Sequence, residues 1–165
     1  MPTLRSFIIT SLTALLLTGM NNSTAATDQD EILALYQGWI RAVESSDIDG
    51  YVGGLYRSNP ALIQRPPGVT GLDGRDNYQT FLGPVFATAR YEITVDTPHS
   101  ITMMGDAAVV EYDYTIRRIV DQSANAELPE GAIEGDSTTS HYIDVVAKDP
   151  AGAWKIRLHS WSQTL

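Results

Sequence analysis

Apolar residues recur at intervals of three and four along residues 28–44. This spacing places them on one face of an amphipathic helix. Asp28 is a candidate N-cap, and Ser45-Ser46-Asp47 ends the helix and caps a shorter one that follows. The residues of the apolar face are Ile32, Leu35, Tyr36, Trp39, Ile40 and Val43. The pattern therefore predicts two consecutive helices at the start of the folded chain.

The rest of the chain changes to strand-like alternation, with one further helix. A short strand is expected in residues 61–65 and a helix over 74–87, with Pro84 disturbing its last turn. Pro98 indicates a bend or bulge inside a long strand. The four long strands are expected at 90–103, 107–120, 136–147 and 153–162. Helices followed by a run of strands predict an α+β fold, with a curved antiparallel sheet packed on three N-terminal helices.

Residues 1–26 have the layout of a secretory signal peptide. A single basic residue, Arg5, precedes an apolar run from Phe7 to Leu17, and small polar residues end at Ala26. The apolar run is shorter than a membrane-spanning helix requires. We expect cleavage near Ala26, a mature domain of residues 27–165, and a periplasmic or secreted protein with no membrane contact after cleavage. An uncleaved N-terminal anchor is the alternative.

Composition excludes several classes of chemistry. The formal net charge of −9 opposes nucleic acid as a partner. The chain contains no cysteine, so thiol nucleophiles, thiolate metal sites and disulfides are excluded. The three histidines are far apart and lack the spacing of a metal motif. We therefore expect no metal and no cofactor.

Several stretches resemble the nuclear transport factor 2-like superfamily, particularly its SnoaL-like and steroid-isomerase-like branch. They are EILALYQGWIRAVESSDIDGYVGGLY, GLDGRDNYQTFL, MMGDAAVVEYDY and AWKIRLHSWS. The resemblance spans nearly all of residues 27–165 and implies a cone-shaped fold with a pocket in its mouth. Relatives often carry histidines on the last strand in phase with its Trp and Ile. Here His159 is out of phase with Trp154 and Ile156.

Side-chain alternation gives candidate pocket residues, because alternate residues of a strand face opposite sides of the sheet. If the more apolar parity faces inward, His141 is the candidate general acid or base, with Tyr112 and Tyr114 as donors to a developing oxyanion. A carboxylate partner for His141 is sought in Asp76 or Glu31. The expected ligand-binding residues are Tyr36, Trp39, Arg65, Tyr112, Tyr114, His141 and Ser160.

The opposite parity of the last strands carries polar and aromatic residues that need a cover if they face outward. We expect a homodimer through this face of the sheet; a ladder of solvated side chains is the alternative. The expected interface residues are Tyr142, Arg157, His159 and Trp161.

Two functions fit these expectations. The first is an exported SnoaL-like domain whose pocket holds a small, largely apolar molecule in a non-catalytic binding or assembly role. It is favoured because the sequence offers no carboxylate base that can be placed inside the cone. The alternative is acid–base catalysis of isomerase, cyclase or dehydratase type on a carbonyl compound, using His141 with Tyr112 or Tyr114.

Overall fold

The computed structural model describes residues 26–56, 63–65, 72–120, 132 and 135–163. The three helices are α1 (Asp28–Glu44), α2 (Ile48–Gly53) and α3 (Arg75–Thr88). The expected signal peptide lies outside the described residues, apart from its last position. Among the described residues, no helix has the length and apolar character needed to cross a membrane.

The helix ends follow local capping chemistry. Thr27, rather than Asp28, is the N-cap of α1: its hydroxyl accepts from the Asp30 N–H at 3.2 Å, and its N–H donates to the Asp30 carboxylate at 3.0 Å. This reciprocal pair is a capping box. α2 begins at the expected Asp47 cap. α3 begins after Gly74, whose φ of +85° favours glycine, and continues past Pro84 to Thr88.

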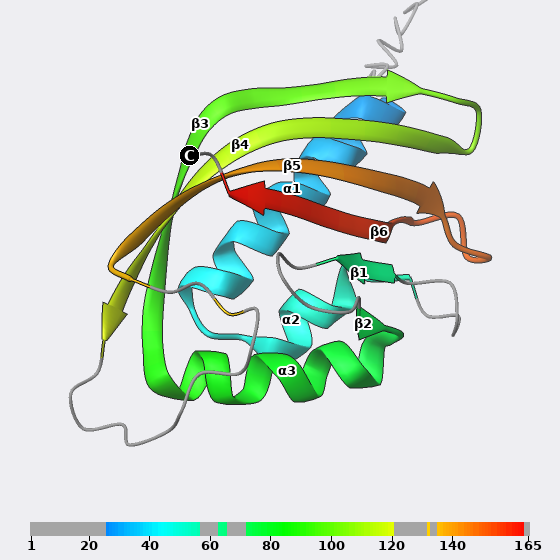
Figure 1. Ribbon diagram of the computed structural model, residues 1–165. Helices are drawn as coiled ribbons and strands as arrows, with labels where there is room; N and C mark the ends of the chain where they lie inside the picture. Colours follow the sequence, from blue (N-terminus) through cyan, green and yellow to red (C-terminus); the bar gives the residue numbers. More distant parts are fainter. Residues whose placement is uncertain (1–25, 57–62, 66–71, 121–131, 133–134, 164–165) are drawn as a thin grey trace, which may run out of the picture.

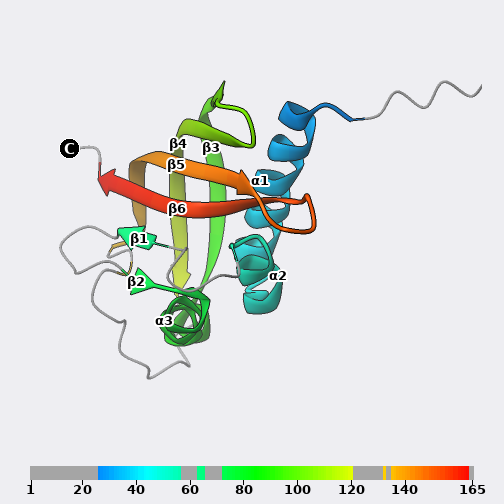
Figure 2. The same cartoon turned by 90° about the vertical axis from the view of Figure 1, so that its right-hand side faces the viewer.

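The strands form one six-stranded sheet with the order β2-β1-β6-β5-β4-β3. The long strands β3 (Ala89–Met103), β4 (Ala107–Val120), β5 (Ser137–Lys148) and β6 (Trp154–Gln163) are antiparallel neighbours. β1 (Ile63–Arg65) pairs parallel with β6 and antiparallel with β2 (Leu72–Asp73). The long strands curve over α1, and the helices lie on one side of the sheet (Figures 1 and 2). The predicted cone-shaped α+β fold is confirmed.

A one-residue bulge divides β6. Val146 pairs with Ile156 and its neighbour Val145 pairs with Leu158, so Arg157 is an extra residue on β6. An extra residue reverses the alternation of all positions beyond it. Trp154 and Ile156 are buried as predicted, and His159, predicted to face outward, is buried as well at 2% exposure.

The predicted inward face of β5 was also wrong. Tyr142 and Asp144 are buried at 2% and 0% exposure, whereas Ile143 is 43% exposed. The reason is pairing: Tyr142 lies opposite Tyr112, which faces the interior, and residues that are directly opposed lie on the same face of a sheet. Both parities of β5 contain apolar residues, so composition alone does not select its inner face.

Candidate active site

A fully buried carboxylate, Asp144, lies between the sheet and the helices. Its Oδ2 accepts hydrogen bonds from the hydroxyls of Tyr36 and Tyr112, each at 2.8 Å, and its Oδ1 lies 2.8 Å from His159 Nδ1. Burying a lone carboxylate is costly, and bonds from three donors offset that cost. Asp144, on β5, thus contacts one side chain from each of three elements, namely α1, β4 and β6.

His159 connects this carboxylate to a cavity. It lies directly opposite Asp144 across the β5–β6 pair and is one of the residues that line the cavity. Because Asp144 engages Nδ1, Nε2 is the ring nitrogen left for a ligand; no hydrogen bond from Nε2 is found among the described residues. A carboxylate bonded to one nitrogen fixes the tautomer and orientation of a histidine.

The cavity lined by His159 is strongly aromatic. Its volume is about 70 Å³. The described residues that line it include no carboxylate, lysine or arginine side chain. Two of the lining residues, Tyr51 and Tyr78, have hydroxyls 2.6 Å apart. The aromatic lining residues are Trp39, Tyr51, Tyr78, Phe81, Phe86, Tyr91, Tyr142 and Trp161.

The buried tyrosines around the site remain protonated. Burial raises the pKa of Tyr36 and of Tyr112 well above the usual value, and the nearby Asp144 charge raises both further. Burial likewise raises the pKa of Tyr51 and of Tyr78. All four hydroxyls therefore keep their protons over the physiological range and can act as donors.

Comparison with solved structures finds the same architecture in other proteins. A nuclear transport factor 2-like superfamily protein from Salmonella enterica serovar Typhimurium is 20% identical, with a TM-score of 0.67, over 83% of this chain and 91% of that chain. A protein proposed to be a dehydratase of this family, from Streptomyces avermitilis, is 17% identical, with a TM-score of 0.68, over 84% and 97%. The chain has the nuclear transport factor 2-like fold.

A third similar structure belongs to a protein proposed to be a scytalone dehydratase, from Novosphingobium aromaticivorans. It is 16% identical, with a TM-score of 0.66, and the match covers 83% of this chain and 84% of that chain. No protein-family model matches the sequence, and no curated protein matches it. At these identities the likeness establishes the nuclear transport factor 2-like fold, and the chemistry has to be argued from this chain's own residues.

Four of the expected ligand-binding residues face the interior of the nuclear transport factor 2-like cone. Trp39 lines the cavity. Tyr36 and Tyr112 are not among its lining residues, and their hydroxyls donate to Asp144 Oδ2. Tyr114 is buried and its hydroxyl lies 2.6 Å from His99 Nε2.

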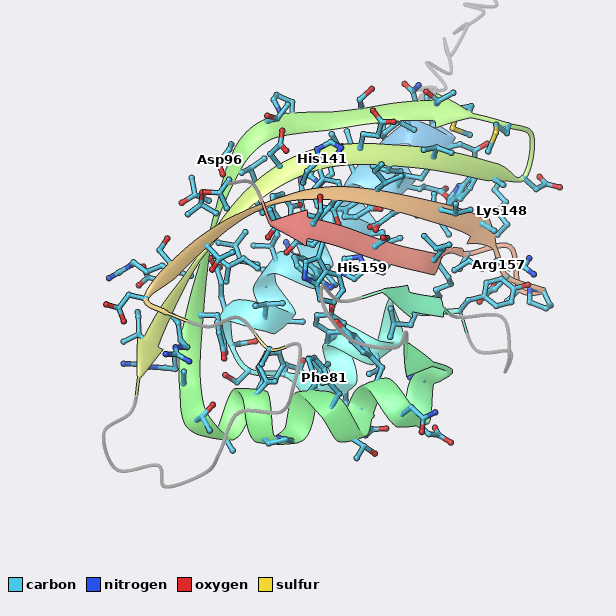
Figure 3. All side chains as sticks on the ribbon, in the orientation of Figure 1. Phe81, Asp96, His141, Lys148, Arg157 and His159 are labelled. Carbon is cyan, nitrogen blue, oxygen red and sulfur yellow. The ribbon has the colours of Figure 1, made fainter. Side chains whose placement is uncertain are left out.

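The remaining expected site residues are placed differently. His141 lies on the outer face of the sheet, where its Nδ1 is 2.8 Å from Asp113 rather than close to Asp76 or Glu31 (Figure 3). Ser160 also faces outward, paired with Ile143. Both errors follow from the inverted parity of β5 and the bulge in β6. The side chain of Arg65 lies outside the described residues.

The structure places the expected dimer residues on different sides of the sheet, because of the bulge in β6 and the inverted parity of β5. Tyr142 and His159 are buried inside the chain, so these two cannot form an outer interface, and the partly buried Trp161 lines the cavity. Figure 3 shows His159 between the sheet and the helices. Arg157, at the bulge itself, is exposed.

Sequence reasoning missed Asp144, Tyr51 and Tyr78. Asp144 shares its parity in β5 with Tyr142, which was expected to face outward. A usable signal was present: Tyr142, Asp144 and Val146 continue the tyrosine-rich face of β4 once Tyr112 is placed opposite Tyr142. That register is not visible in either strand alone.

Proposed function

We propose that the protein is an acid–base enzyme of the dehydratase, isomerase or cyclase type, with His159 as the group that transfers the proton. The observation that carries the proposal is the buried Asp144–His159 pair in the wall of an aromatic cavity. The sequence favoured a non-catalytic role only because it offered no interior carboxylate, and Asp144 removes that reason.

The geometry supports a simple proton-transfer mechanism. His159 Nε2 accepts a proton from the carbon next to a substrate carbonyl, while Asp144 accepts the hydrogen bond from Nδ1–H and stabilises the imidazolium. Tyr36 and Tyr112 already donate to Oδ2, so the carboxylate is held in place beside His159. His159 then returns its proton to a leaving hydroxyl, which departs as water, or to a second carbon, which gives an isomer.

The Tyr51–Tyr78 hydroxyl pair is suited to the electrophilic half of this reaction. Of two hydroxyls joined by one hydrogen bond, one uses its proton in that bond and the other keeps a proton to donate. A donor directed at the carbonyl oxygen stabilises the enolate that forms when the proton leaves carbon. The pair and His159 line the same cavity.

The lining defines the class of substrate. With no carboxylate, lysine or arginine side chain among its described lining residues, the cavity favours a neutral, largely apolar molecule, and aromatic walls favour a planar one. The volume of about 70 Å³ is less than half of the ~150 Å³ of a cavity that admits benzene. A ring-sized substrate must therefore displace part of the lining when it binds. Similar structures proposed to be dehydratases support the same class of reaction.

The test is turnover of small cyclic β-hydroxyketones by the purified mature protein. Loss of water creates a conjugated product that is followed by ultraviolet absorbance, and exchange of the α-proton in D₂O is followed by proton NMR. We expect both reactions with the wild type and a loss of at least about 100-fold with His159→Gln, the scale of general acid–base catalysis. We expect Asp144→Asn to reduce both reactions by a comparable factor.

His141→Gln is the matched control, because it changes the same residue type on the other face of the sheet. It should keep wild-type turnover. Ligand binding without turnover or exchange by the wild type would favour the non-catalytic binding role, and equal losses in both histidine variants would contradict the assignment of His159.

Export remains part of the proposal. The signal-like pattern of residues 1–26 supports it, and mass spectrometry of the mature protein from a periplasmic or culture fraction tests it. A chain beginning at Thr27 is the expected product. A cell-associated chain that retains Met1 would contradict export.

We also propose a homodimer through the outer sheet face, now with different residues. Ile143 is exposed there at 43%, beside the partly exposed His141. Ile143→Glu should convert a dimer into a monomer in light scattering coupled to size exclusion. A wild-type monomer at all concentrations would contradict the proposal.

A further inference from the structure

His99 lies at an irregularity of β3, against the two tyrosines that bond to Asp144. Thr97 pairs with Asp113 and Ser100 pairs with Glu111, so Pro98 and His99 together stand opposite the single residue Tyr112. This is the bulge that Pro98 predicted. A bulge redirects the side chains next to it, and here it sets the partly buried His99 ring against buried aromatic residues.

The neighbours of His99 are the two tyrosines that hold Asp144. Its ring centroid is 4.6 Å from that of Tyr36 and 4.7 Å from that of Tyr112. Its Nε2 lies 2.6 Å from the hydroxyl of Tyr114, which anchors the ring in this position. We call Tyr36 and Tyr112 the tyrosine clamp, since both hydroxyls donate to Asp144 Oδ2.

We propose that His99 is a positioning residue, which sets the tyrosine clamp on Asp144 and couples its own protonation to the Asp144–His159 pair. The contacts run from His99 to the clamp, from the clamp to Asp144 Oδ2, and from Asp144 Oδ1 to His159. The consequence for catalysis rests on the proposed function; the coupling itself does not.

Protonation of His99 can act on the buried pair formed by Asp144 and His159. The ring is only partly buried, so solvent protons can reach it. Burial lowers the pKa of His99, and the charge of Asp144 opposes that shift. The titratable groups that face His99 are Tyr36 from α1, Tyr112 and Tyr114 from β4, and, beyond the clamp, Asp144 from β5.

Protonation of His99 changes the field at Asp144. A positive charge then lies against the rings of Tyr36 and Tyr112. It stabilises the negative charge of Asp144 and competes with the His159 imidazolium for that charge. Because coupling between two binding sites is reciprocal, a proton on either histidine must weaken proton binding at the other.

The experiment is a pH titration of the ring nitrogens of the three histidines by nitrogen-15 NMR, from about pH 5 to pH 8. Assignments come from His99→Phe, His141→Asn and His159→Gln. In the wild type we expect the His159 signals to show an inflection at the pH where His99 itself titrates. His99→Phe should abolish that inflection and His141→Asn should leave it unchanged. The proposal would be overturned if the His159 signals showed no inflection at the pH where His99 titrates.

A second variant keeps the test decisive if His99→Phe does not fold. Tyr114→Phe retains the aromatic ring but removes the hydroxyl that anchors His99, so it should move the pH at which His99 titrates. The inflection in the His159 signals must move with it. An inflection that stays in place would overturn the coupling. No substrate is needed, so failure of the proposed function would appear in the turnover assay while this coupling remains measurable.

Discussion

His159 and Asp144 lie directly opposite one another on β6 and β5, with Nδ1 of the histidine 2.8 Å from Oδ1 of the carboxylate. The neighbouring pair of strands carries the same arrangement, because His141 Nδ1 lies 2.8 Å from Asp113 Oδ1. The two pairs occupy opposite faces of one sheet. The first has side-chain exposures of 2% and 0%, the second of 43% and 31%. The two pairs have the same distance between histidine and carboxylate and differ in their exposure to solvent.

The same substitution in the two histidines should therefore have very different effects. His159→Ala leaves a buried carboxylate without one of its partners, and we expect a loss of about 3–5 kcal/mol in the free energy of unfolding. His141→Ala breaks a solvated pair and should cost at most about 1 kcal/mol. Urea denaturation measures both. Equal losses, or a larger one for His141→Ala, would show that the faces of β5 and β6 are reversed.

The bulge in β6 can be tested by removing its extra residue. Deletion of Arg157 makes the pairs Val146–Ile156 and Val145–Leu158 consecutive, so His159 and Trp161 should keep their inward direction and the fold should tolerate the change. Insertion of one alanine between Leu158 and His159, by contrast, should turn His159 and Trp161 outward or shift the strand, which exposes apolar surface or buries polar groups, so we expect a loss of several kcal/mol in unfolding free energy. Tryptophan emission and urea denaturation report it. Arg157→Ala, which keeps the residue count on an exposed site, should change stability by no more than about 0.5 kcal/mol.

The tyrosine clamp should stabilise the fold by holding the Asp144 charge. Tyr36→Phe and Tyr112→Phe each remove one hydrogen bond to a buried carboxylate and retain the ring. We expect each to cost about 1.5–3 kcal/mol in urea denaturation. Tyr56→Phe is the control, because the side chain of Tyr56 is only partly buried. A clamp variant that matches this control would mean that the hydroxyls do not support Asp144.

The start of α1 should respond to acid. Hydrogen bonds from Lys148 and from Trp154 hold the pKa of Asp28 below its usual value. A lowered carboxyl pKa in the folded state means that the unfolded state binds more protons in acid, so the stabilisation is present above about pH 4 and is lost as the pH falls further. Asp28→Asn should reduce stability at neutral pH and have little effect near pH 2.

Unfolding by urea at both pH values measures this difference. Asp106→Asn, at an exposed turn between β3 and β4, serves as the control. A loss from Asp28→Asn that is the same at both pH values would show that the contact does not depend on the charge of Asp28.

Local signals in the sequence determined much of the architecture. Spacing of three and four residues located α1 and its buried face, Asp47 located the start of α2, and Pro98 located one of the two irregularities in β3. The order of helices and strands then led to the α+β cone. These features depend on neighbours along the chain, namely caps, turn residues and the period of a helix, and therefore can be read from it.

Tertiary structure alone decided which histidine faces the cavity. Alternation in a strand has a period of two, so one extra residue at Arg157 inverts the face of His159, and nothing in AWKIRLHSWS marks where that residue is inserted. Likewise, β5 has apolar residues at both parities, and its inner face follows from the pairing of Tyr142 with Tyr112. The convergence of α1, β4 and β6 on Asp144 depends on that pairing, because contacts between distant segments exist only once the sheet has formed.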